Sequence, residues 1–217
     1  KGASGGSNIV ISGTAPTFTT TNTSIAFNTS DVTLANSGTT TINTGSGAGG
    51  VTFGAKVETN GGGNDNLTIT SGEGNVTFTG SVGAGNSLGA LSVNASSGDG
   101  DITFTSTIGD SDSAGTSGTT AIGNDATEVI YFNNTLYSFD GGQTTITAKD
   151  GLNTRVSQAN TTIKVNGEAL RFDESALSLS SGANLTISSN GGAITVEKRI
   201  RNDAGSATLT IDAGTTS

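Results

Sequence analysis

The sequence predicts an all-β protein, a parallel β-helix of about eight coils with about 25 residues in each coil. Three observations lead to this prediction. Short apolar–polar–apolar triplets recur along the chain, turn-forming residues separate them, and six of the eight phenylalanines occupy one place in the repeat. No stretch has the 3.6-residue apolar period of an amphipathic helix.

The triplets recur at intervals close to the length of one solenoid coil. Their starts are separated by 26, 25, 26, 28, 40 and 24 residues, and the starting residues are Ile25, Val51, Val76, Ile102, Ile130, Leu170 and Ile194. Side chains alternate along a strand, so the first and third residues share one face and the middle residue, commonly Thr or Ser, faces outward. Such a period indicates units that bury their apolar faces by stacking on one another.

Most units also share an internal spacing of apolar residues. One unit contains Val76, Phe78, Val82, Leu91 and Val93, and the last unit repeats this spacing position for position with Ile194, Val196, Ile200, Leu209 and Ile211. Between the strands lie turn-forming segments such as GAGNS at Gly83–Ser87. Three short strands per unit fit one coil of a parallel β-helix.

Stacked coils place equivalent residues about 4.8 Å apart, one above another. We therefore expect an inward ladder of aromatic rings, formed by Phe27, Phe53, Phe78, Phe104, Phe132 and Phe172. With ladders of Val, Ile and Leu on the other walls, a narrow core forms from only 31% hydrophobic residues. A β-propeller would need about 40 residues per blade, and a stacked β-sandwich remains an alternative.

The domain organisation is predicted to be a single β-helix over residues 1–217. The one long step, 40 residues, leaves about 15 residues more than one coil needs. We expect residues 147–169 to form an insertion or a degenerate coil, where Lys149, Arg155 and Lys164 concentrate positive charge. Loops that extend from a regular solenoid often make its specific contacts.

Composition excludes some functions. The net charge is −9, from 18 acidic and 9 basic residues, and no basic stripe is present, so nucleic acid is not an expected partner. The absence of Cys excludes disulfides and thiolate chemistry and is compatible with a secreted protein. No apolar run is long enough to span a membrane. The chain opens KGASGGS, which reads as a mature or excised piece of a precursor.

Two segments resemble a known family. The segments GNVTFTGSVGAGNSLGALSVNASSGDGDITF and GANLTISSNGGAITVEKRI are similar to the repeats of filamentous-haemagglutinin-like adhesins and related large bacterial surface proteins. The resemblance covers roughly residues 25–214. It implies a right-handed parallel β-helix that is exported and displayed as a long fibre, with binding activity in added loops or other domains. It implies no functional residue, because the matching positions belong to the core.

Catalytic and metal chemistry is limited by the absence of His, which excludes Ser-His-Asp and Cys-His systems and histidine metal sites. Alternating carboxylates in loops supply the oxygen ligands that Ca²⁺ prefers, and the weak candidates are Asp99, Asp101, Asp110 and Asp112. Asp is also common in solvated turns, which is the reading that we favour. No cofactor is expected, although Ca²⁺ remains possible.

The most charged stretch, EKRIRND at Glu197–Asp203, gives the best case for an enzyme. Polysaccharide lyases and hydrolases built on β-helices place acidic residues and Arg or Lys along one sheet. Such a site needs acidic partners at equivalent positions of neighbouring coils. Those positions, read as residues 54–59 and 79–84, hold mainly small or apolar residues. We therefore expect a charge-paired solvated face and no enzyme.

The expected function is structural. The segments Asn8–Phe18 and Ala207–Gly214 read as further strands without polar caps, which predicts either a slice of a longer solenoid or a subunit that stacks end to end into an extracellular surface fibre. The alternative is a carbohydrate-binding adhesin module with an exposed aromatic groove. Tyr137 and Phe139, which lie off the Phe ladder, are its candidate residues. A β-helix polysaccharide lyase or hydrolase is a weaker alternative.

Overall fold

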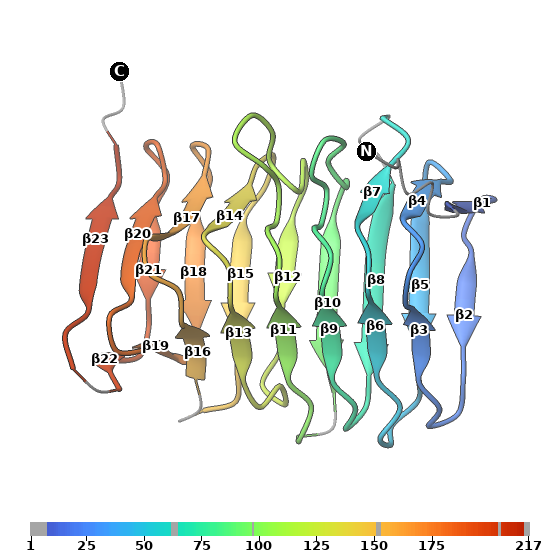
Figure 1. Ribbon diagram of the computed structural model, residues 1–217, viewed down its shortest axis with the longest axis horizontal. Helices are drawn as coiled ribbons and strands as arrows, with labels where there is room; N and C mark the ends of the chain where they lie inside the picture. Colours follow the sequence, from blue (N-terminus) through green and yellow to red (C-terminus); the bar gives the residue numbers. More distant parts are fainter. Residues whose placement is uncertain (1–7, 62–64, 97, 151–152, 204, 215–217) are drawn as a thin grey trace, which may run out of the picture.

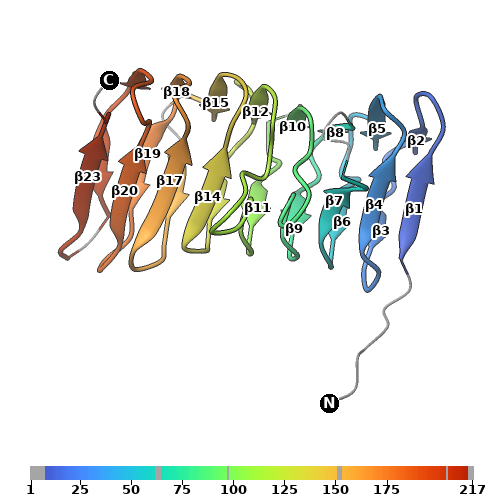
Figure 2. The ribbon, with the colours of Figure 1, turned by 90° about the horizontal axis from the view of Figure 1, so that it is seen from above.

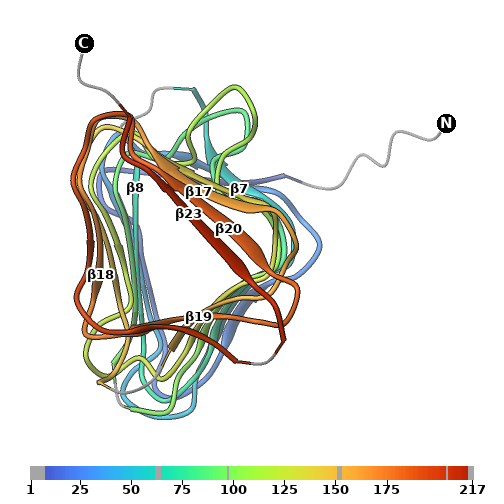
Figure 3. The same cartoon turned by 90° about the vertical axis from the view of Figure 1, so that its left-hand side faces the viewer.

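The computed structural model describes residues 8–61, 65–96, 98–150, 153–203 and 205–214. The chain winds through three parallel sheets that form the walls of a three-sided column (Figures 1 and 3). There are about eight coils, about 24 residues apart along the chain, and the described residues contain no helix. The prediction of an all-β parallel β-helix is therefore confirmed.

Sheets B and C each contain one strand from every coil. In order along the column, sheet B consists of β2 (Thr17–Thr19), β5 (Thr39–Asn43), β8 (Asn66–Ser71), β10 (Leu91–Ala95), β12 (Thr120–Ile122), β15 (Thr144–Thr147), β18 (Leu170–Asp173) and β21 (Ile194–Val196). Sheet C consists of β3 (Ile25–Phe27), β6 (Val51–Phe53), β9 (Val76–Phe78), β11 (Ile102–Phe104), β13 (Ile130–Phe132), β16 (Asn153–Val156), β19 (Ala176–Leu179) and β22 (Ile200–Asn202).

Sheet A, the third wall, has two parts. They are β1 (Ile9–Ser12), β4 (Val32–Ala35) and β7 (Val57–Thr59), then β14 (Leu136–Phe139), β17 (Thr161–Val165), β20 (Asn184–Ser188) and β23 (Thr208–Asp212). Single parallel bridges join Val57 to Val82, Val82 to Ile108 and Ile108 to Tyr137, so the wall continues through the two coils between the parts. Figure 2 shows the strands of successive coils side by side along the column.

An aromatic ladder occupies the inner face of sheet C. Neighbouring rings are stacked, with centroids 5.0 Å apart for Phe27–Phe53, 5.2 Å for Phe53–Phe78, 5.0 Å for Phe78–Phe104 and 5.6 Å for Phe104–Phe132. This confirms five members of the predicted ladder. The strand register explains the stacking, because these five residues are consecutive partners along the sheet.

The sixth predicted member, Phe172, is not part of this ladder. Phe172 is fully buried, but it lies on β18 in sheet B, where its partners are Ile146 and Val196. The prediction was wrong because two sheets offer the same apolar spacing. Whether a unit starts in sheet C or in sheet B, its apolar residues occur in the same order. Two lie in the first strand, one lies in the second strand and two lie in the third.

The described residues between 147 and 169 form no insertion and no degenerate coil. β16 pairs with β13 and β19, and β17 pairs with β14 and β20, so both strands lie within regular coils. The 40-residue step contains one coil of 24 residues, from Ile130 to its partner Thr154, and 16 residues that lead from Thr154 in sheet C to Leu170 in sheet B. The change of starting sheet produced the apparent excess.

The end coils are more exposed than the middle of the column. The segments Asn8–Phe18 and Ala207–Gly214 contain strands, as predicted: β1 and the start of β2 in the first, and β23 in the second. The large apolar side chains exposed among the described residues belong to these coils, namely Ile9, Val10, Ile200 and Ile211. The apolar column is therefore open at both described ends.

Candidate functional site

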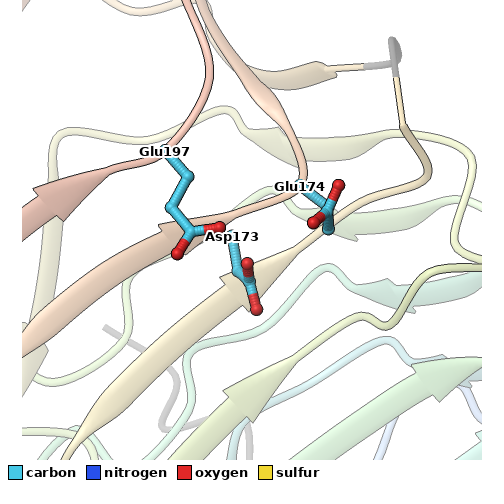
Figure 4. Close-up of side chains that lie close together, drawn as sticks. All are labelled: Asp173, Glu174 and Glu197. Atoms are coloured by element: carbon cyan, nitrogen blue, oxygen red, sulfur yellow. The ribbon is translucent and has the colours of Figure 1, made fainter.

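A cluster of charged residues lies where sheet B meets the turn toward sheet C in the last coils. Carboxylate oxygens of Asp173, Glu174 and Glu197 lie within 4.8 Å of one another (Figure 4). Asp173 ends β18, and Glu197 follows β21, the next strand of the sheet. Strand pairing places Phe172 opposite Val196, so Asp173 and Glu197 occupy equivalent positions in adjacent coils.

The expectation that the stretch EKRIRND has no acidic partner in a neighbouring coil was wrong. It depended on residues 54–59 and 79–84 being the equivalent positions, but these residues lead from sheet C to sheet A. The structure places Glu197 at the end of sheet B instead, where the equivalent residue of the preceding coil is Asp173. A neighbouring acidic partner therefore exists, although the earlier coils do not extend the pair into a longer row, since Thr147 is opposite Asp173.

Basic side chains neutralise the cluster. The Arg171 guanidinium contacts Asp173 at 3.3 Å and also pairs with Glu197, while Lys198 Nζ lies 2.9 Å from Glu174 and 3.4 Å from Asp150. A hydrogen bond with the Asp173 carboxyl raises the pKa of Glu197, and one with Glu174 raises the pKa of Lys198. Because solvent screens exposed ion pairs, these contacts contribute little to stability.

The calcium candidates lie apart from this cluster. Within the described ranges, Asp173, Glu174 and Glu197 form the group of acidic residues whose oxygens could share a metal ion. This group contains none of the calcium candidates, Asp99, Asp101, Asp110 and Asp112. Asp101 Oδ1 accepts the Val129 amide at 3.0 Å, and partial burial raises the Asp101 pKa. Asp110 Oδ1 accepts three bonds within its own turn. The Asp110 carboxylate therefore stabilises its own turn, and the Asp101 carboxylate joins two adjacent coils.

The aromatic candidates are not surface residues. Tyr137 is 0% exposed and Phe139 is 1% exposed. The Tyr137 ring packs edge-on against Phe132, with centroids 4.5 Å apart, and its hydroxyl donates to the Phe104 carbonyl and accepts the Asn134 amide. Burial raises the pKa of this phenol. The prediction that Tyr137 and Phe139 are exposed for ligand binding was wrong. Tyr137 is bridged to Ile108 and Phe139 to Thr116, and because these partners face inward, the two aromatic residues face inward as well.

An outward aromatic residue was missed. Tyr131 lies between the inward Ile130 and Phe132 on β13, and its neighbours on the outer face of sheet C are Thr103 and Arg155. Partial burial is the main cause that raises the Tyr131 pKa, and Asp101 and Glu128 also contribute. The sequence signal was available, because Tyr131 occupies the middle position of a triplet, where Thr is usual.

The described part of the chain contains no helix long and apolar enough to cross a membrane. Comparison of the sequence and structure with models of known protein families, with curated proteins and with solved structures found no match in any of the three. The geometry of this chain and the resemblance of its repeats are therefore the grounds on which a function can be proposed.

Proposed function

We propose that this chain is a non-enzymatic structural element of an extracellular surface fibre or adhesin, in which solenoid coils stack end to end. The observation that supports this most is the open edge at each described end of the column. β1, β2 and β3 at one end, and β21, β22 and β23 at the other, each pair on one side only. Unpaired strands are templates for further strands.

The exposed apolar residues lie at the same two ends. Ile9 is 36% exposed on β1, and Ile211 is 51% exposed on β23, and both occupy inward-facing positions of sheet A. A further coil would extend all three parallel sheets and cover the open column. It would come either from the same polypeptide or from a second copy of this chain. The resemblance to filamentous-haemagglutinin-like repeats supports the extracellular fibre.

The alternatives have less support. The stacked pair Asp173 and Glu197 favours a polysaccharide lyase or hydrolase, but Arg171 bridges the two carboxylates and reduces their freedom to act as acid and base. Turnover of an acidic polysaccharide that is lost in Glu197→Gln would support the enzyme. A carbohydrate-binding module based on Tyr137 and Phe139 is not supported, because both side chains are buried.

Self-stacking predicts that the purified chain forms filaments as its concentration rises. Eight coils at about 4.8 Å give an axial repeat of roughly 40 Å, to be measured by electron microscopy and sedimentation. Ile9→Lys and Ile211→Lys should each suppress assembly, because an inward-pointing lysine on an edge strand opposes pairing. Thr52→Lys, on the outer face in mid-column, is the matched control and should still assemble. A chain that remains monomeric at every concentration contradicts self-stacking.

A further inference from the structure

The outer face of sheet A carries a polar cleft whose lining includes Asp112 and Phe139, two residues that the sequence singled out for other roles. Its volume is about 340 Å³, and it spans three successive coils beside a loop that precedes β12. This overhanging loop, residues 109–115, projects beyond the turns of the coils that follow it (Figures 1 and 3). The difference in loop length between neighbouring coils creates the cleft.

Two rows of polar side chains form the floor, and both run parallel to the column. The strand register aligns one row from β14, β17 and β20, consisting of Ser138, Lys164 and Ser188. The second row lies two residues further along each coil and consists of Asp140, Asn166 and Asn190. Each row therefore presents one polar group per coil, about 4.8 Å apart.

Several of these groups have hydrogen-bonding capacity to spare. Ser138 is only 3% exposed and lines the floor of the cleft. Lys164 forms no ion pair with any described carboxylate. Asn190 Nδ2 donates to Asn166 Oδ1 at 2.7 Å, which leaves the Asn166 amide donors and the Asn190 oxygen available.

The overhanging loop is held in place before any ligand binds. Asp110 Oδ1 accepts the amides of Asp112 and Ser113, at 2.9 and 2.8 Å, and the Ser113 hydroxyl at 3.0 Å. These bonds lower the pKa of Asp110, so the carboxylate stays charged in this role. The Gly115 amide donates to the Ser138 carbonyl at 2.8 Å, which fixes the loop to the floor. A pre-organised wall reduces the entropy cost of binding.

We propose that this cleft binds a neutral oligosaccharide that lies along the column, with successive sugar units over successive coils. Hydroxyl groups need both donors and acceptors, and the cleft offers an ammonium, amides, hydroxyls and the carboxylates of Asp112 and Asp140. The two carboxylates oppose an acidic saccharide. The repeat of a linear sugar chain is close to the coil spacing of about 4.8 Å, so each sugar unit meets one side chain of each polar row. The inference does not depend on end-to-end stacking.

Titration calorimetry of the folded chain with cellohexaose, xylohexaose and chitohexaose, and with hexagalacturonate as the acidic counterpart, tests the proposal. We expect at least one neutral oligosaccharide to bind with a Kd on the order of 1 mM or tighter. Lys164→Ala and Asp112→Ala should each weaken binding about tenfold, because each removes a charged hydrogen-bonding partner. Neither side chain makes an ion pair within the described ranges, so both variants should fold.

Lys149→Ala and Asp125→Ala are matched controls, because both side chains are exposed and lie outside the cleft. Binding to the controls should stay within about twofold of the parent chain. The proposal is overturned if no neutral oligosaccharide binds, if hexagalacturonate alone binds, or if the cleft variants bind as tightly as the controls. The stacking variants Ile9→Lys and Ile211→Lys should keep full binding, which separates this test from that of the proposed fibre.

Discussion

Phe78→Ala is expected to lower the free energy of unfolding by about 3–5 kcal/mol. Phe78 is 0% exposed and stands at the middle of the five-ring ladder, 5.2 Å from Phe53 and 5.0 Å from Phe104. Its removal leaves a cavity that neighbouring rings cannot fill, because the strand register fixes each ring to its own coil. Urea denaturation followed by far-ultraviolet circular dichroism measures the loss.

The adjacent Thr77→Ala is the control for this variant. Thr77 lies on the same strand but faces outward, so its replacement should change the free energy of unfolding by no more than about 0.5 kcal/mol. Because each coil is stabilised by its neighbours, Phe78→Ala should also increase amide exchange in the coils of Phe53 and Phe104. A loss below about 1 kcal/mol would mean that the ladder is not the main source of cohesion.

Gly141→Ala is expected to lower the free energy of unfolding by about 2–5 kcal/mol. Gly141 has φ of +75°, and a Cβ atom there would lie 1.9 Å from the Ser117 carbonyl oxygen in the preceding coil. The backbone of that coil would have to move, which would disturb the stacking of adjacent coils. Thermal and urea denaturation measure the combined cost of backbone strain and collision.

Gly182→Ala separates these two contributions. Gly182 has nearly the same φ, +78°, but a Cβ atom there would have nothing within 4 Å. This variant should therefore show only the backbone cost of about 1–2 kcal/mol. Equal losses in the two variants would contradict the close approach of successive coils at Gly141.

The periodicity of the sequence was sufficient to predict the architecture, because each apolar triplet must bury one face. The pairs Val76–Phe78 and Ile102–Phe104 specify an inward face, a register and a repeat length without any further information. Local pattern could not identify the sheet to which a triplet belongs. Leu170–Phe172 and Val51–Phe53 are equivalent as patterns, yet they belong to sheets B and C.

The error in sheet assignment had consequences for the candidate site. It separated Glu197 from Asp173, which the structure stacks in adjacent coils, and it made regular strands of residues 147–169 look like an insertion. Tyr137 illustrates a different limit. Its strand β14 was not recognised, and the ring points into the column because Tyr137 pairs with the buried Ile163 on one side and bridges to the buried Ile108 on the other. The polar cleft forms because one loop is longer than the turns beside it. This difference in length can be recognised only after the coils have been aligned with one another.

The central claim is that consecutive coils stack in register, so that each phenylalanine of sheet C lies above the last. Disulfide formation between introduced cysteines tests this most directly, because the chain has no cysteine of its own. Thr77 and Thr103 face outward as direct partners on β9 and β11, and parallel partners about 4.8 Å apart are within disulfide range. The pair Thr52 and Thr103 is separated by two coils, about 9.6 Å, which is too far.

We predict that Thr77→Cys/Thr103→Cys forms an intramolecular disulfide under mild oxidation of the folded chain, whereas Thr52→Cys/Thr103→Cys remains reduced. Mass spectrometry of proteolytic fragments measures both. Failure of the first pair to cross-link, or equal cross-linking of the two pairs, would contradict the stacked register and with it the aromatic ladder.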